Sequence, residues 1–272
     1  MRRYNLAAAL LSACLATAPA WAGATLDRVS KSGTVTDILV NDYPPFSYID
    51  DNNQLAGFDV DVAKAFADKI GAKLKLETPG WEAIIAGKWN GRYDLCIGST
   101  TPSTDRAQVL DFPVVYYDSP AVLVVHKDSK IASVADLTGK KVGVGSGSSY
   151  EAYLGKTLQI PGALKPITFP FGDVSAVPGD ETVAFQNLAL GSGVRLDAVV
   201  ADLATTKARI DKGAPLKIAA ELYAEPNVVT TDKGDPEWDA KVRDTILALK
   251  QDGTLAAISR KWFGEDITAN AR

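Results

Sequence analysis

Strand-like and helix-like segments alternate along this chain, and the alternation runs through two series. In the first, a β-branched apolar stretch at 34–40 precedes residues 58–70, where apolar side chains recur every fourth position, and a strand-like pattern follows at 72–77. A spacing of four marks one face of a helix, and a glycine ends it. A second series begins with apolar strands at 121–125 and 141–144. Such alternation predicts an α/β fold of largely parallel sheets flanked by helices, with ligands bound beyond the carboxyl ends of the strands.

The same patterns predict the remaining elements. We expect helices at 81–89, 150–157, 183–190, 238–249 and 254–263, and strands at 95–97 and 196–201. The segment 170–180, rich in Gly, Pro and Asp, is expected to be a surface loop. Two series in a chain of 272 residues are enough for two lobes, each with its own core.

Residues 1–22 have the three parts of a secretory signal peptide. Arg2 and Arg3 supply positive charge, and the apolar stretch 6–16 is too short to span a bilayer. The small residues at 20–22 then match a cleavage site, so we expect export to the periplasm. An alternative remains at 11–14, which also fits a lipoprotein cleavage box and would leave Cys14 lipidated; the apolar sequence that continues beyond it favours the unanchored form.

Composition excludes several classes of function. Cleavage after Ala22 would leave 27 basic and 33 acidic side chains, a net charge of −6, which argues against nucleic acid or an anionic membrane surface as a partner. Cys96 would be the one remaining cysteine, which precludes an intrachain disulfide. With one histidine, His126, at the end of an apolar strand, we expect no zinc site, no other metal site and no Ser-His-Asp triad.

A run of hydroxyl side chains at 99–104 follows the strand at 95–97 and leads to Arg106. Hydroxyls and free N–H groups at a strand end are donors, and a guanidinium can clamp both oxygens of a carboxylate. The pattern therefore favours a site for a small carboxylate. The alternative is that Arg106 is a surface residue paired with Asp105 or Asp111.

Five motifs in order identify a family. They are Tyr43-Pro44-Pro45-Phe46, Gly57-Phe58-Asp59-Val60-Asp61-Val62, Thr101-Pro102-Ser103-Thr104-Asp105-Arg106, Val142-Gly143-Val144-Gly145-Ser146-Gly147 and Leu196-Asp197-Ala198-Val199-Val200-Ala201-Asp202. Each is weak alone, but together they cover nearly the whole mature chain. The sequence resembles the periplasmic solute-binding proteins of polar-amino-acid ABC transporters, family 3.

That resemblance implies a two-lobed periplasmic binding protein fold of type II. Lobe 1 would span 27–118 plus 227–272 and lobe 2 would span 119–226, closing on an L-amino acid. It implies a monomer that binds no cofactor and delivers its ligand to the permease and ATPase of the inner membrane.

The resemblance also implies roles for seven residues at the ligand. They are Arg106, Thr101 and Ser149 on the α-carboxylate, Asp202 and the carbonyl of Ser99 on the α-ammonium, and Tyr43 and Trp81 on either side of the ligand. Other roles stay open at three of these positions. Asp202 could cap a helix at 203–210, while Tyr43 and Trp81 could be core aromatics.

Departures from the family and rival functions also remain. Val40 stands where relatives that bind basic amino acids carry an acid, and 170–193 is longer than usual. Asp59 and Asp61 are expected to be charges at a helix start.

A periplasmic dehydratase of the cyclohexadienyl type is the enzymatic alternative, with Glu151 as its candidate acid. A sensor that reports ligand to a membrane kinase is a third possible function.

Overall fold

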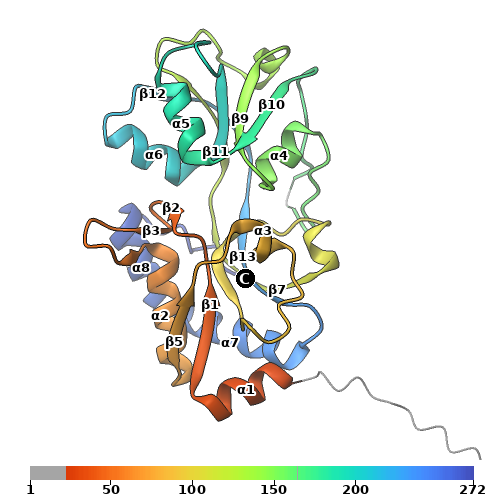
Figure 1. The fold of residues 1–272 in the computed structure, drawn as a ribbon, viewed down its shortest axis with the longest axis vertical. Helices are drawn as coiled ribbons and strands as arrows, with labels where there is room; N and C mark the ends of the chain where they lie inside the picture. The colour runs from red at the N-terminus through yellow and green to blue at the C-terminus, as the bar shows by residue number, and fades with distance from the viewer. Residues whose placement is uncertain (1–22, 164) are drawn as a thin grey trace, which may run out of the picture.

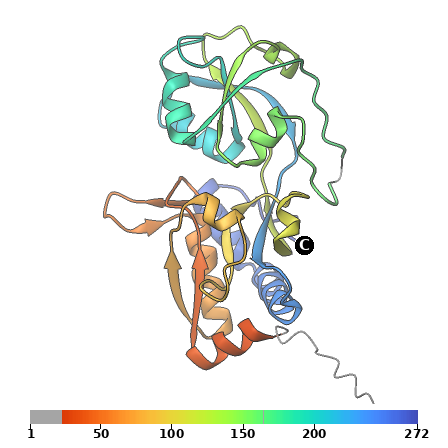
Figure 2. The same ribbon diagram turned by 45° about the vertical axis from the view of Figure 1, so that its right-hand side comes forward.

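The computed structural model describes residues 23–163 and 165–272, which form two lobes stacked one above the other (Figures 1 and 2). The predicted signal peptide and Cys14 lie outside the described residues. The chain crosses between the lobes after Asp118 and returns before Pro226.

The lobe drawn lower in Figure 1 contains both ends of the described chain. Its elements are α1 Ala24–Ser32, β1 Thr34–Ile38, β2 Asp42–Tyr43, β3 Ser47–Ile49, β4 Leu55–Ala56, α2 Phe58–Ile70, β5 Lys73–Glu77, α3 Trp81–Ile85, β6 Cys96–Thr100, η1 Arg106–Gln108, β7 Leu110–Asp118, β13 Pro226–Asp232, α7 Pro236–Gln251 and α8 Thr254–Phe263. We call this lobe 1. β1 pairs with β5 in parallel, and β13 lies between β6 and β7 as an antiparallel neighbour of both.

The upper lobe, called lobe 2, is built on a five-stranded sheet. Its elements are β8 Ala121–His126, η2 Val134–Leu137, β9 Lys141–Gly145, α4 Ser149–Leu154, β10 Ser175–Gly179, α5 Glu181–Ala189, β11 Ala198–Asp202, α6 Leu203–Asp211 and β12 Leu216–Tyr223. The strand order is β10-β9-β11-β8-β12. Every residue of β8 is buried: Leu123 and Val125 pack into one cluster and Val122 and Val124 into another, on opposite faces. Coverage of both faces explains why this strand is an unbroken apolar run.

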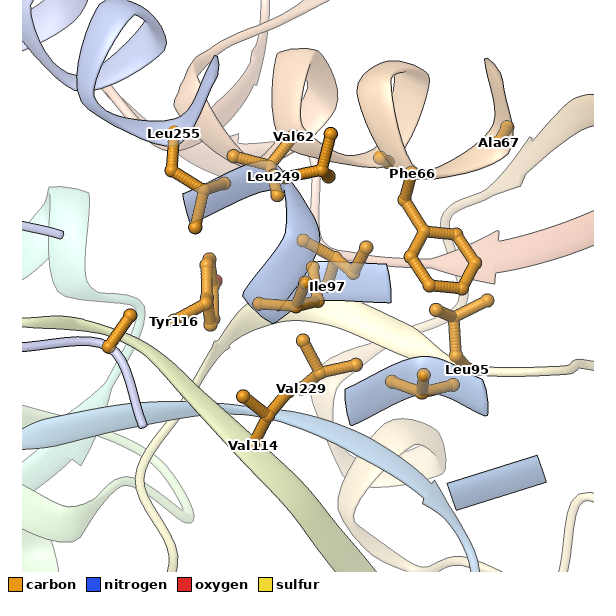
Figure 3. Close-up of a cluster of buried hydrophobic side chains, with 14 of the residues drawn as sticks. Val62, Phe66, Ala67, Leu95, Ile97, Val114, Tyr116, Val229, Leu249 and Leu255 are labelled. Atoms are coloured by element: carbon orange, nitrogen blue, oxygen red, sulfur yellow. The ribbon is translucent and has the colours of Figure 1, made fainter. Parts of the chain in front are cut away.

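The core of lobe 1 lies between its sheet and the helices α2, α7 and α8 (Figure 3). Val62 and Phe66 on α2 are fully buried against Leu95 and Ile97, so the face with a spacing of four is the one that packs. Burying side chains of this size stabilises a fold by about 1.5–3 kcal/mol each.

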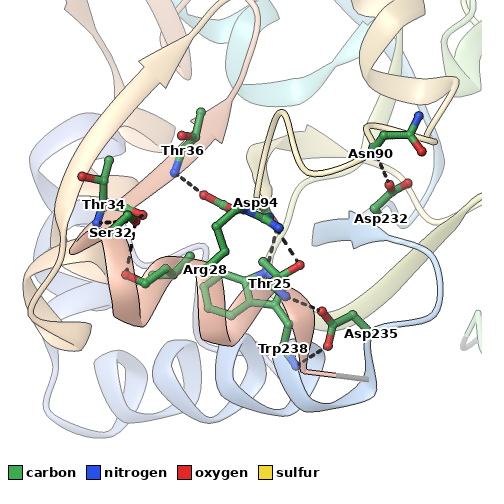
Figure 4. A network of polar contacts seen from close by, with 11 residues as sticks. Thr25, Arg28, Ser32, Thr34, Thr36, Asn90, Asp94, Asp232, Asp235 and Trp238 are labelled. Carbon is green, nitrogen blue, oxygen red and sulfur yellow. Dashed lines mark hydrogen bonds and ion pairs between the residues drawn. The ribbon is translucent and has the colours of Figure 1, made fainter. Parts of the chain in front are cut away.

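A polar network fixes α1 to the rest of lobe 1 (Figure 4). Asp94 pairs with Arg28 of α1 at 2.5 Å and accepts the N–H of Thr36 in β1 at 2.7 Å. Asp235, which caps α7, accepts the N–H of Thr25 at 3.0 Å. These contacts join α1 to β1, to Asp94 and to the start of α7, which are far apart in sequence.

Most predicted elements are present, although the helix expected at 81–89 ends at Ile85 and the helix expected at 150–157 ends at Leu154. Two larger differences concern the sheets. The sheets are mixed, because the strands that flank the crossings, β7, β8, β12 and β13, run antiparallel to their neighbours, while β1-β5 and β10-β9-β11 keep the predicted parallel pairing. The expected loop 170–180 contains an exposed edge strand, β10, paired with β9. An edge position explains how a strand can hold Pro178, which lacks a donor N–H. Among the described residues, no helix is long and apolar enough to cross a bilayer.

Candidate ligand-binding site

A cleft of about 490 Å³ lies between the two lobes. Six of the seven residues expected at the ligand line it: Tyr43, Trp81, Ser99, Thr101 and Arg106 from lobe 1 and Ser149 from lobe 2. The seventh, Asp202, is not among the lining residues. Tyr43 stacks on Phe46 at 5.4 Å between ring centres, so it both packs on the lobe 1 core and faces the cleft.

Arg106 is buried at the cleft, with 8% of its surface exposed. Its Nη1 donates to the carbonyl of Thr101 at 2.8 Å and its Nη2 to the carbonyl of Gly147 at 2.9 Å. Within the described residues no carboxylate lies at ion-pairing distance, and Asp111, a proposed partner, pairs with Lys233 at 3.0 Å. Burial lowers the pKa of Arg106, and the charge of Glu225 opposes that shift. The site therefore holds a desolvated cation without a contacting anion.

Gly147 brings the loop of lobe 2 close to lobe 1. Its φ is +66°, and a Cβ there would lie 3.2 Å from Ile85 and 3.5 Å from Trp81. Its carbonyl also accepts the indole N–H of Trp81 at 3.3 Å. Glycine is therefore needed both for the left-handed backbone and for the close approach. Glu151 closes the loop by accepting the N–H of Gly147 at 2.7 Å.

Ser99 is held by a buried carboxylate that the sequence analysis placed at a helix start. Asp59 accepts the hydroxyl of Ser99 at 2.6 Å and that of Tyr116 at 2.7 Å, and the Tyr116 oxygen accepts the Ser99 N–H. These contacts fix Ser99 at a left-handed φ of 52°. Burial raises the pKa of Asp59 to about 7, against the lowering effect of both hydroxyls. The expectation for Asp59 was incomplete, because its side chain supports a residue that lines the cleft.

Asp202 is the N-cap of α6. Its Oδ1 accepts the N–H groups of Ala204 and Thr205 at 2.6 and 3.0 Å, as the capping interpretation predicts. Burial raises the pKa of Asp202 to about 7. After burial, its charge is the next influence that raises the pKa of Tyr43 and of Glu181, which both line the cleft. Asp202 is therefore buried outside the cleft lining, and its charge acts on two residues that line the cleft.

Glu225 is a buried acid that the sequence analysis missed. It is 1% exposed and lies in the segment that returns from lobe 2 to lobe 1. Its Oε1 accepts the hydroxyls of Thr101 and Ser149, and its Oε2 accepts that of Tyr150. No motif marks this position; the one available signal was an acid between two apolar strands.

Four carboxylates also line the cleft, from both lobes. They are Asp42, Glu82, Asp180 and Glu181. Asp180 raises the pKa of Asp42, second to burial, although the two lie in different lobes. The buried Oε1 of Glu181 has no hydrogen-bond partner, and burial raises the pKa of Glu181 to about 8 despite the opposing charge of Arg209. Within the described chain, His, Cys, Asp and Glu form no cluster that could hold a metal ion.

Comparisons with known proteins agree with one another. The model of the bacterial extracellular solute-binding proteins, family 3, matches residues 25–265. The L-cystine-binding protein TcyJ of Escherichia coli is 32% identical over 89% of this chain and 87% of its own length. The L-arginine-binding protein of Pseudomonas aeruginosa is 30% identical over 83% of this chain and 86% of its own length.

Solved structures give the same result. An ancestral arginine-binding protein bound to arginine superposes with a TM-score of 0.74 at 34% identity, covering 85% of this chain and 99% of that one. An ancestral amino acid-binding protein, described as a precursor of cyclohexadienyl dehydratase, has a TM-score of 0.77 at 30% identity, covering 88% of this chain and 99% of that one.

Proposed function

Because this chain belongs to the bacterial extracellular solute-binding proteins of family 3, we propose that it captures a free α-amino acid between its lobes and delivers it to a membrane permease. It is an amino-acid-binding protein of an ABC transporter rather than an enzyme. The observation that carries the assignment is Arg106, a buried cation at the cleft with no contacting anion among the described residues. A ligand carboxylate supplies that anion.

The two ends of a zwitterion meet different groups in this cleft. Arg106 binds the α-carboxylate through the guanidinium donors that Thr101 and Gly147 leave free. The carbonyl of Ser99 receives the α-ammonium, and the charge of Asp202, which acts on the pKa of Tyr43 after burial, favours that end. Trp81 and Tyr43 cover the ligand from the lobe 1 side.

The distal end of the ligand is cationic in this proposal. Asp42 and Asp180 line the cleft from opposite lobes, and after burial the charge of Asp180 raises the pKa of Asp42, so closing the cleft on a neutral ligand would bring two like charges together. Glu181 adds a carboxylate oxygen without a partner. Val40 argued against a basic ligand, but these three residues supply acid at other positions. L-Arginine, which several relatives bind according to their names, has a cationic side chain that matches these three acidic residues.

The remaining assignments concern the whole protein. We place it in the periplasm as a monomer, with residues 1–22 removed, beside a permease and an ATPase of the inner membrane. In this proposal the lobes divide at 118/119 and 226/227. The crossings after Asp118 and before Pro226 support this division, the second to within one residue. Mass spectrometry of the exported protein reports the cleavage site and any lipid on Cys14.

A thermal-shift screen of the standard amino acids and L-cystine tests the function. A ligand present at 100 times its Kd stabilises the folded state by about 2.7 kcal/mol, which is a shift of several degrees. We expect the largest shifts with L-arginine and L-lysine, and a flat response to every compound contradicts the receptor assignment. Incubation with prephenate should give no aromatic product, because Glu151 is engaged with Gly147.

A further inference from the structure

The hydroxyls of Thr101 and Ser149 line the cleft, and we call this part of its surface the cleft floor. The carboxylate of Glu225 is buried outside the cleft lining, bonded to both hydroxyls, where the chain returns from lobe 2 to lobe 1. It joins both lobes, since Thr101 belongs to lobe 1 while Ser149 and Tyr150 belong to lobe 2. The charged and titratable groups that act on it from the surrounding elements are Arg106, Tyr150, Tyr223, Asp202, Glu181 and Tyr43.

The hydroxyl protons of Thr101 and Ser149 are already donated to Glu225, so they are not free to bind a ligand. A serine or threonine hydroxyl has one proton, and an ionised carboxylate can only accept. The Oε1 atom of Glu225 lies 2.6 Å from Thr101 Oγ1 and 2.5 Å from Ser149 Oγ, so each hydroxyl donates its proton to Glu225. Thr101 Oγ1 and Ser149 Oγ also lie 3.3 Å apart, but these shorter contacts to Glu225 use the one proton of each hydroxyl. Toward the cleft, both oxygens then present lone pairs. Lone pairs repel a carboxylate and accept from an ammonium group.

We propose that Glu225 is a positioning residue that sets the hydrogen-bonding polarity of the cleft floor, so that binding of the ligand carboxylate against Thr101 or Ser149 requires Glu225 to take up one proton. This inference rests on the proposed function, because it places the ligand carboxylate beside Arg106. It goes beyond that function in naming a residue outside the cleft lining and a proton in the binding equilibrium.

The proton balance follows from the contacts. One proton from solvent adds to Oε1 of Glu225, which then donates to one of the two hydroxyl oxygens and accepts from the other. The hydroxyl that now accepts turns its own proton to the ligand carboxylate. One proton therefore frees one donor. The second hydroxyl stays bound to Glu225, and Arg106 supplies the remaining donors.

The surroundings make this protonation accessible. Burial raises the pKa of Glu225, while the three hydroxyls and Arg106 lower it. An arriving ligand carboxylate neutralises Arg106 and draws away one hydroxyl, which removes two of the lowering influences and raises the pKa further. Binding then becomes weaker as the pH rises, by up to about tenfold per pH unit above the pKa of the free protein.

Calorimetry of L-arginine and L-cystine binding tests the proposal. Each titration is run at one pH in Tris and in phosphate, whose ionisation enthalpies differ, so that the protons taken up per ligand can be calculated. Glu225→Gln supplies a neutral side chain of the same size that can donate to the hydroxyls. Glu221→Gln is the matched control, since Glu221 is exposed on β12.

We expect the wild type and Glu221→Gln to take up about one proton more per ligand than Glu225→Gln, in which binding loses its tenfold-per-unit dependence on pH. The difference in proton uptake between the proteins cancels any proton exchange at Glu181 and Asp202, because all three proteins retain both residues. A difference near zero overturns the proposal. The proposal is also overturned if the wild type takes up no proton on binding and its affinity does not depend on pH. This second result does not depend on any variant being folded.

A measurement on the ligand-free protein separates this proposal from the proposed function. The infrared difference between wild type and Glu225→Gln, followed from pH 5 to 10, reports ionisation of Glu225. Titration within that range supports the proposal even if neither amino acid binds, in which case only the ligand assignment fails. A Glu225 that stays protonated up to pH 10 overturns it, because the ligand-free protein would then have no ionised carboxylate to take up a proton.

Discussion

The guanidinium of Arg106 lies 5.0 Å from the centre of the Trp81 ring, over its face. A cation over an indole face is attracted by the ring quadrupole, and Arg106 also donates to two carbonyls, one from each lobe. Three contacts therefore orient the guanidinium before a ligand arrives. Pre-orientation of this kind lowers the entropy cost of binding.

Arg106→Lys tests whether the planar guanidinium is needed. A lysine keeps the charge but cannot hold both carbonyls and a ligand carboxylate at once. We expect the Kd for the preferred amino acid to rise at least 100-fold by calorimetry, equivalent to about 3 kcal/mol. The matched control is Arg195→Lys, at an exposed site of lobe 2, where affinity should not change. Unchanged binding in Arg106→Lys would exclude a bidentate contact.

Gly147→Ala tests the close approach of the two lobes. Gly147 and Gly139 both have a positive φ, +66° and +75°, but a Cβ at Gly139 would meet nothing within 4 Å. Either substitution should cost about 1 kcal/mol of stability through the left-handed backbone. Only Gly147→Ala should also weaken ligand binding, because it pushes Ile85 and Trp81 away. Equal affinities in the two variants would remove this contact from the site.

Glu181→Gln tests whether the carboxylates of Asp42, Asp180 and Glu181 select a ligand with a cationic distal end. At pH 8.5, above the raised pKa of about 8, removing the charge without changing the size should weaken L-arginine binding by about tenfold or more, consistent with an effect of about 1–2 kcal/mol from one nearby charge. L-Glutamine, with an uncharged amide end, should lose little. Calorimetry with both ligands gives the comparison, and Glu221→Gln again serves as an exposed control. Parallel losses for both ligands would point to a general disturbance of the cleft.

Asp202→Asn separates capping from ligand recognition. Asparagine is a good N-cap, so α6 should be retained with a loss of stability below about 1 kcal/mol. If the charge favours the α-ammonium, ligands with a free α-amino group should lose more affinity than their N-acetylated analogues. The same fold-loss for both kinds of ligand would leave Asp202 with its capping role alone.

Local patterns predicted the elements well where the cause is local. The helix at 58–70 and the helix at 254–263 have the bounds that apolar spacing and flanking glycines indicated. The edge strand β10 was missed because its pairing with β9 is a tertiary contact, and its exposed face carries no alternating apolar pattern.

The residues of the candidate site also divide into those that a local sequence pattern predicts and those that depend on tertiary contacts. Arg106 could be predicted, since a hydroxyl run ending in arginine is a sequence pattern. Glu225 could not, because its role exists only where the end of β6 in lobe 1 and the start of α4 in lobe 2 bring Thr101 and Ser149 together. Asp59 has the sequence appearance of a helix-start charge, and only the position of Ser99 shows the second use of that carboxylate.

Asp59 should give the protein a characteristic dependence of stability on pH. Its pKa is about 7 in the folded protein against 3.8 as the ordinary value, so between these values the folded state binds more protons than the unfolded state. The free energy of unfolding from this group therefore falls as the pH rises from about 4 to about 7, by up to about 4 kcal/mol.

Denaturant unfolding of wild type and Asp59→Asn at intervals from pH 4 to 8 measures this contribution. Asparagine cannot ionise but can still accept one of the two hydroxyl bonds, so the variant should lose stability at pH 4 and much less relative to wild type at pH 8. The difference between the two curves isolates Asp59 from Asp202, whose pKa is also raised to about 7 and which both proteins retain. A difference that does not change with pH would mean that Asp59 ionises in its ordinary range, and that its hydrogen bonds to Ser99 and Tyr116 compensate fully for burial.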